Sequence, residues 1–217
     1  MKIKNIELCN WGRYQKTSVP VDTSNGKNLV LIRAINNTGK TSLFYAIRYA
    51  FYGEKGLKGH KQQNDPLDWI NRQAAAKGNG QMYVELTIEH EGKDYRIQRT
   101  QKFYQTNTGQ SIQPDGDEEL QIFDQSKGGP SADAGKTNAT RDNWISSTLI
   151  SLDASQFFFF DGEDIQQYTD QPKEAVKKAI LRVLGIKVLT NAKTDLENTQ
   201  KTFNEIHSKK LKEKSKD

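Results

Sequence analysis

The 217-residue sequence predicts an α/β fold, and three observations support this prediction. Residues 28–33 (NLVLIR) form a short apolar run that predicts a strand buried on both faces. Residues 41–53 (TSLFYAIRYAFYG) then carry apolar side chains at helical spacing and end in a glycine, which is a natural helix stop. Residues 81–90 and 95–104 alternate like strands on either side of the turn EGKD, and together they predict an antiparallel hairpin.

The other segments of the first two thirds of the chain are less regular. Residues 2–8 (KIKNIEL) alternate in polarity and predict a strand. Residues 53–80 have the composition of a loop, and residues 105–141 are so rich in Gly, Ser, Asp, Thr and Asn that they predict an exposed or mobile insertion. A short helix is expected within residues 142–155. The helix over residues 41–53 is expected to bury one face, formed by Leu43, Phe44, Ile47, Ala50 and Phe51.

The last part of the chain is predicted to be helical from Pro172 onward. Six residues in it follow the spacing of a coiled coil: Leu189, Ala192, Leu196, Thr199, Phe203 and Ile206. We therefore expect two parts, a domain over residues 1–171 and a helical segment over residues 172–217 that starts a coiled coil. A single amphipathic stripe needs a partner, so we expect the sequence to be the front part of a longer protein.

The bulk composition excludes some classes of protein. The single cysteine, Cys9, rules out a disulfide framework and a cysteine-rich zinc site. The N-terminus has no signal-peptide pattern, and no apolar run approaches the roughly 20 residues needed to span a bilayer. We therefore expect a cytoplasmic protein without a membrane partner. The net charge of +5 permits a nucleic-acid partner but does not require one.

Residues 34–41 (AINNTGKT) match the phosphate-binding pattern G-x-x-x-x-G-K-[ST] except at the first position, which is Ala34. In that pattern Gly39 lets backbone N–H groups approach phosphate, Lys40 reaches the β- and γ-phosphates, and Thr41 offers its hydroxyl to Mg²⁺. Ala34 is tolerated if its φ is negative, and asparagine at position 37 tolerates a left-handed backbone. A chance GKTS string is the alternative. The residues expected to contact the nucleotide are Asn36, Asn37, Thr38, Gly39, Lys40, Thr41 and Ser42.

A set of motifs in chain order resembles a known family. NWGRY (residues 10–14), the loop with GKTS, LFYAIRYAFYG (43–53), the hairpin, FFFFDGEDI (157–165) and the coil pattern are similar to the N-terminal half of an SMC/Rad-type ABC ATPase. Within that superfamily the sequence is most similar to the DndD family, ATPases associated with DNA phosphorothioation and its restriction. Other prokaryotic defence ATPases of the same build, such as the Lamassu type, resemble it closely too.

The resemblance implies a P-loop NTPase fold: the N-terminal lobe of an ABC-type head, with an antiparallel β-subdomain and an outgoing coiled-coil helix. It implies ATP and Mg²⁺ as cofactors. It places Arg13 near the nucleotide, although a solvated turn residue is the alternative. It also places Asp161 at the Q-loop, where the family has glutamine, with a role near Mg²⁺ or the attacking water. A Walker B strand and a plain buried strand are the alternatives for this aromatic run.

The resemblance also implies a function for the complete protein. Lys40 and Asp161 would serve ATP hydrolysis, while the signature motif and Walker B carboxylate would lie in a C-terminal half of the head. ATP would join two such heads in a homodimer, and hydrolysis would be coupled to DNA, in anti-phage defence or restriction, with other defence subunits as further partners. The alternatives are a nucleotide-sensing module that does not hydrolyse ATP and a coiled-coil scaffold or adaptor. Trp11 and Tyr14 could stack on bases or pack under the first hairpin.

Overall fold

A computed structural model describes the chain over residues 1–21, 29–58, 65–78, 80–106, 111–155, 158–159, 192–193 and 195–204. The chain divides into two compact units, Met1–Leu152 and Asp153–Asp217. The predicted boundary between residues 171 and 172 falls outside the described residues and stays a prediction. Among the described helices, none is long and apolar enough to cross a bilayer.

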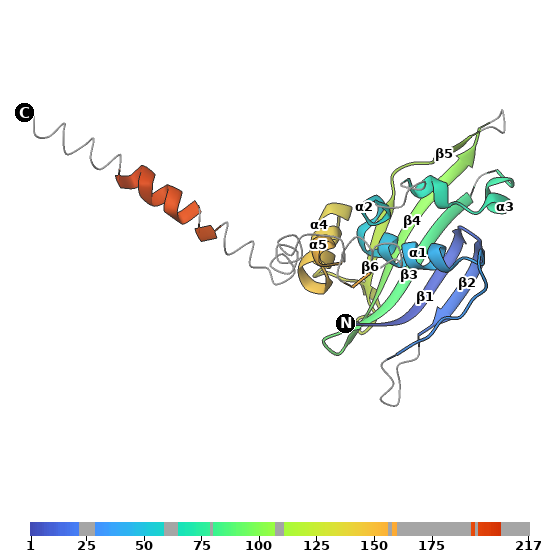
Figure 1. Ribbon diagram of the computed structural model, residues 1–217, viewed down its shortest axis with the longest axis horizontal. Coiled ribbons are helices and arrows are strands. Elements are labelled where there is room, and N and C mark those ends of the chain that lie inside the picture. The colour runs from blue at the N-terminus through green and yellow to red at the C-terminus, as the bar shows by residue number, and fades with distance from the viewer. Residues whose placement is uncertain are drawn as a thin grey trace, which may run out of the picture. The chain divides into compact units, whose positions relative to one another are not determined.

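The first unit is built on one antiparallel sheet (Figure 1), in the order β2-β1-β3-β4-β6-β7 with β5 paired to β4. The strands are β1 (Lys2–Trp11), β2 (Tyr14–Pro20), β3 (Gly80–His90), β4 (Lys93–Gln105), β5 (Ile112–Pro114), β6 (Glu119–Asp124) and β7 (Gly129–Pro130). The predicted hairpin is confirmed, because β3 and β4 pair from Gly80↔Phe103 to His90↔Lys93.

The helices are α1 (Lys40–Tyr52), α2 (Glu54–Leu57), α3 (Arg72–Ala75), α4 (Asn138–Trp144) and α5 (Leu152–Ser155). Two short turns accompany them, a 3-10 turn over Pro66–Trp69 and a π-helical turn over Ile145–Leu149. Helix α1 contacts β1, β3 and β4 and covers one face of the sheet. The strands bury alternate residues on that face, among them Ile6, Leu8, Val84, Leu86 and Ile97.

Helix α1 ends where the sequence predicts, at Gly53, whose N–H donates to the Tyr49 carbonyl. Its buried face differs in part from the prediction, since Tyr45, Ala46 and Tyr49 are buried while Phe44 and Ile47 are only half-buried. The helix is covered on more than one side, so it buries more residues than the single apolar face that the sequence predicts. In the second unit, residues 195–204 are helical, as predicted, with Leu196 and Phe203 exposed.

The prediction of a buried strand over residues 28–33 is wrong for the residues that the structure describes. Residues 29–35 belong to no strand or helix, and their apolar side chains are exposed: Leu29 82%, Val30 41%, Leu31 69%, Ile32 48% and Ile35 81%. The apolar run was identified correctly. However, a strand buried on both faces needs a neighbouring strand and a covering layer, and no described part of the chain supplies them here.

Two further expectations need correction. Residues 105–141 contain β5, β6 and β7, with Leu120 and Ile122 buried, so this segment is not simply an exposed insertion. The alternation of polar and apolar residues in ELQIFD (Glu119–Asp124) predicts a strand, but the polar residues on either side of it dominate the composition of the segment. Within residues 53–80, Trp69 and Ile70 are buried beside short helical turns, so this stretch is a packed part of the domain rather than a plain loop.

A pair of leucine substitutions tests the unusual exposure of residues 29–35. Leu31→Ala should change the free energy of unfolding by less than about 0.5 kcal/mol, because its side chain is already in water. Leu86→Ala, the matched change at a fully buried site, should cost about 2–5 kcal/mol. Urea unfolding of both variants measures this difference. An equal loss at both positions would show that residues 29–33 are packed in a core.

Candidate functional site

The loop before α1 has the backbone that a phosphate site requires. Gly39, the residue before the helix, has φ 109°, and Asn37 is left-handed with φ 66°, a conformation that asparagine tolerates. Ala34 is not among the described residues with positive φ, so its methyl group causes no strain at the position where the common pattern has glycine. The missing first glycine is therefore compatible with the loop conformation.

Lys40 holds the loop together from the first position of α1. Its ammonium Nζ donates to the carbonyls of Ala34 (3.0 Å) and Ile35 (2.9 Å), and the Thr38 hydroxyl donates to the Ile35 carbonyl (2.7 Å). These bonds turn the loop back on itself with Lys40 at its mouth and exposed to solvent. An anion that enters the loop therefore meets a positive charge that is already positioned.

The amino end of α1 favours an anion. The helix runs for 13 residues, Gly39 provides no side-chain cap and the first turn carries no acidic residue. The first N–H groups of a helix lack partners within the helix, and the aligned peptide dipoles place positive potential there. Together with Lys40, this end of α1 has the chemistry of a phosphate-binding site.

The turn between β1 and β2 lies against this loop. Arg13 Nη2 donates to the Asn37 side-chain oxygen (2.8 Å), and the Tyr14 hydroxyl donates to the Gly39 carbonyl (3.1 Å). Gly12 has φ 52°, and a Cβ there would lie 2.9 Å from Ser42 Oγ, so the close approach requires glycine. The structure thus brings Arg13 to the loop, and its approach to a nucleotide stays a prediction.

Trp11 fixes the position of that turn. Its indole is fully buried, stacks on Tyr49 (4.9 Å between ring centroids) and Trp69 (5.2 Å), and donates to the Ser42 carbonyl (2.7 Å). Of the two interpretations open for Trp11, the structure shows packing rather than a surface for stacking bases. The same ring therefore contacts the sheet, the first turn of α1 and the segment that follows the helix.

A groove of about 800 Å³ opens beside the loop. The loop side includes Arg13, Asn37 and Ser42, and the opposite side is formed by residues 67–73. Asn71, only 6% exposed, holds the two sides together: its amide donates to the Gly12 carbonyl (2.9 Å) and its oxygen accepts from the N–H groups of Gln73 and Ala74. The volume falls within the range of small-molecule sites.

The sequence analysis missed the second wall of this groove. Asn71 and Trp69 lie in a segment of loop-like composition, and their importance depends on partners some 60 residues earlier in the chain. The one local signal was Asn71 ahead of RQAA, because asparagine is a preferred helix N-cap.

The other predicted site residues lie along the loop. Asn36, Thr38 and Thr41 are exposed and Ser42 is half-buried at the first turn of α1. Asp161, predicted as a Q-loop residue and Mg²⁺ ligand, lies outside the described residues, and its role stays a prediction.

The loop at residues 34–41 and the amino end of α1 have the geometry of a P-loop protein. Comparison with known proteins agrees with this class. The family model described as an AAA domain (AAA_23) matches residues 5–217, so the chain belongs to this family. No curated protein matches the sequence. The chain is also similar to a solved structure from work on ATP-driven dimerization and DNA stimulated activation of SMC ATPases, with 16% identity, a TM-score of 0.52 and coverage of 83% of this chain and 98% of that chain. The predicted fold class, an α/β P-loop head of SMC-like build with an antiparallel β-subdomain, is confirmed.

A tyrosine next to Trp11 predicts how stability depends on pH. The Tyr49 hydroxyl is buried without a hydrogen-bond partner among the described residues, and burial, then the nearby Glu118 carboxylate, raise its pKa well above the usual value. Above a pH of about 10 the unfolded chain loses this proton while the folded chain keeps it. Stability should therefore be complete below that pH and fall above it, by up to about 1.4 kcal/mol per pH unit.

Tyr49→Phe should reduce this alkaline loss but not abolish it, because burial also raises the pKa values of Tyr14, Tyr83 and Tyr95. The variant should cost less than about 1 kcal/mol at pH 7, because an unbonded buried hydroxyl contributes little. Urea unfolding between pH 7 and pH 11 provides the measurement. Tyr104→Phe, at a position 40% exposed, is the control and should leave the profile unchanged. A loss above about 2 kcal/mol at pH 7 in Tyr49→Phe would show that the hydroxyl is bonded in the folded chain.

Proposed function

We propose that residues 34–41 bind the phosphates of Mg-ATP. The single observation that supports this most strongly is the amino end of α1, where uncapped N–H groups, Gly39 in a glycine-dependent conformation and the Lys40 ammonium converge on one loop. Lys40 would exchange a carbonyl partner for the β- and γ-phosphates. Thr41, in the first turn of α1, would direct its hydroxyl to Mg²⁺.

The rest of the nucleotide would lie in the groove beside the loop. Backbone N–H groups of Asn36 to Thr41 and the Ser42 hydroxyl would face the phosphates, with Arg13 at the edge that it shares with Asn37. The nucleoside would extend toward residues 67–73, whose position depends on Asn71. Asp161 is proposed to approach Mg²⁺ or the attacking water from the segment that follows.

ATP hydrolysis is proposed for the complete head. The signature motif and the Walker B carboxylate would come from a C-terminal half of the head, as the resemblance implies. Its place on this chain would be residues 29–35, an apolar segment outside any strand with exposed Leu29, Leu31 and Ile35. A second head would complete the nucleotide site, as ATP-driven dimerization is described for the SMC ATPases of similar fold.

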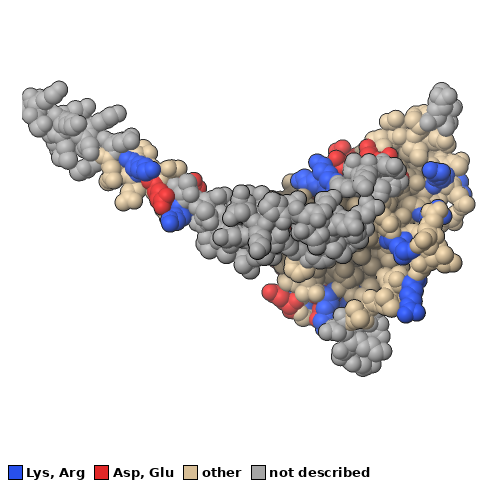
Figure 2. Space-filling model, in the orientation of Figure 1, with Lys and Arg blue, Asp and Glu red and all other residues tan. Residues whose placement is uncertain are grey.

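The cellular role follows from the resemblance to DndD and to other defence ATPases. Hydrolysis in the cytoplasm would be coupled through the coiled coil to DNA or to another defence subunit. The net charge of +5 is compatible with DNA. Over the face that Figure 2 shows, however, the Lys and Arg side chains of the described residues lie singly or next to acidic ones rather than in one continuous basic stripe. The support for DNA binding is therefore the resemblance.

Calorimetric titration of Mg-ATP onto the 217-residue chain tests the loop. The unmodified chain should bind, and Lys40→Ala should weaken binding at least about tenfold, since one charge-assisted contact to phosphate is lost. Lys102→Ala removes an exposed lysine on β4 and should bind like the unmodified chain. Equal binding by all three proteins would place the nucleotide elsewhere. If a complete head, made of both halves, binds ATP but does not hydrolyse it, the nucleotide-sensing alternative is favoured. If it neither binds nor hydrolyses ATP, the scaffold is favoured.

The role of Thr41 is tested through the metal dependence of binding. Thr41→Val keeps the shape of the side chain and removes the hydroxyl that would coordinate Mg²⁺. Its affinity for ATP with Mg²⁺ should fall roughly tenfold, to the value that the unmodified chain shows with EDTA. Affinity without metal should be the same in both proteins. A loss that is equal with and without Mg²⁺ would contradict the metal role.

A further inference from the structure

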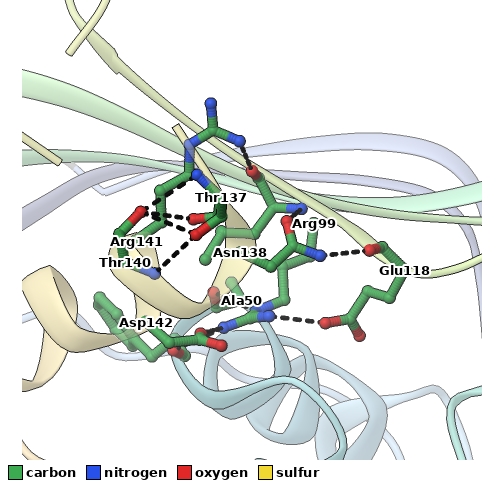
Figure 3. Close-up of polar contacts among 10 residues, drawn as sticks. Ala50, Arg99, Glu118, Thr137, Asn138, Thr140, Arg141 and Asp142 are labelled. Atoms are coloured by element: carbon green, nitrogen blue, oxygen red, sulfur yellow. Dashed lines mark hydrogen bonds and ion pairs between the residues drawn. The ribbon is translucent and has the colours of Figure 1, made fainter. Parts of the chain in front are cut away.

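The carboxyl end of α1 is held by a buried arginine from the sheet. Arg99 lies in the middle of β4, on the face that α1 covers, and is 2% exposed. Its guanidinium donates from Nε to the Ala50 carbonyl (3.0 Å) and from Nη2 to the Phe51 carbonyl (3.0 Å). The last carbonyls of a helix lack partners within the helix, and α1 has no basic residue of its own in its last turn. Arg99 supplies the missing cation (Figure 3).

Two carboxylates from different parts of the chain balance the charge of Arg99. Nη1 donates to Glu118 Oε1 (2.6 Å), and Nη2 donates to Asp142 Oδ1 in α4. The packing is close: a Cβ at Gly53 would lie 2.9 Å from Glu118 Oε1 and 3.0 Å from Arg99 Nη1. A buried guanidinium requires such partners, so the cluster joins α1, β4 and α4 at one point.

The segment that begins with α4 is attached to α1 a second time. The hydroxyl of Tyr52, the last residue of α1, donates to the Ile150 carbonyl (3.1 Å). Between the two attachments the chain forms the π-helical turn Ile145–Leu149, a geometry that is rare and often found at functional sites. Asn138, at the start of α4, is fixed separately by bonds to the Glu118 carbonyl (2.5 Å) and the Leu120 N–H (3.0 Å).

Helix α1 therefore has a phosphate-binding loop at one end and the Arg99 cluster at the other. Its 13 residues span about 20 Å as a rigid rod. A displacement of the amino end is transmitted along such a rod, because its internal hydrogen bonds leave it little freedom to bend. Arg99 is bonded to the last turn and to Asp142, so it would carry that displacement to α4.

We propose that Arg99 is a positioning residue of the nucleotide site and that its ion pair with Asp142 transmits nucleotide occupancy from α1 to α4. This inference rests on the proposed binding of Mg-ATP by residues 34–41. When phosphates occupy the loop, Lys40 releases a loop carbonyl, α1 settles against the anion and the Arg99–Asp142 contact orders the segment from Asn138 to Leu149. Along the chain this segment precedes the aromatic run and Asp161.

Amide hydrogen exchange of the full 217-residue chain, with and without saturating Mg-ATP, tests the proposal. In the unmodified chain, nucleotide should slow exchange both in the loop and in residues 138–149, the latter by about fivefold or more. Asp142→Ala keeps Glu118 as the partner of Arg99, and alanine favours the helix. In this variant the loop should still respond, while the ratio of rates with and without nucleotide in residues 138–149 should return to about one.

The control is Asp133→Ala, which removes an exposed carboxylate five residues before α4 that pairs only loosely with Lys127 (3.9 Å). It should keep the full response. A merely structural role for the ion pair would speed exchange of α4 equally with and without nucleotide and leave the ratio unchanged, which would overturn the proposal. So would a loop response without any response of α4 in the unmodified chain. Absence of nucleotide binding altogether, seen as no response even in the loop, would overturn the proposed function and this inference with it.

Discussion

The buried indole of Trp11 is the contact on which the candidate site depends. It lies at the end of β1, between the rings of Tyr49 in α1 and Trp69 in the segment after the helix, and it bonds the Ser42 carbonyl at the first turn of α1. The residues of the loop are themselves mostly exposed and make few packing contacts. Their position therefore comes from the turn that Trp11 anchors, and the groove exists because the same ring also holds its far wall.

The two ends of α1 are electrostatically distinct. At its amino end lie the cations Lys40 and Arg13, and no acidic side chain is present in the first turn. At its carboxyl end the cation comes from the sheet through Arg99, with counter-charges from Glu118 and Asp142. The cation at the carboxyl end stabilises the helix, whereas the positive charge gathered at the amino end is left for an anion to neutralise. The helix thereby connects the candidate phosphate site with α4, which lies far from the loop.

Local signals were sufficient for the hairpin and for the end of α1 at Gly53, because each depends on residues adjacent in sequence. Local signals failed where the structure of a segment depends on contacts with residues distant in sequence. Residues 29–33 have the composition of a central strand, yet composition cannot show whether a partner strand is present. Asn71 and Arg99 belong to a polar loop and a strand in the sequence. The role of Asn71 appears only when the fold brings Gly12 to it, and that of Arg99 only when the fold brings the end of α1 to it.

A crystal structure of the chain with Mg²⁺ and a non-hydrolysable ATP analogue would test the central claim most directly. The account predicts phosphates cradled by the backbone of residues 36–41, Lys40 Nζ moved from the Ala34 or Ile35 carbonyl to a phosphate oxygen, and the nucleoside in the groove beside Asn71. Phosphates bound at another place, with Lys40 still bonded to both carbonyls, would contradict it.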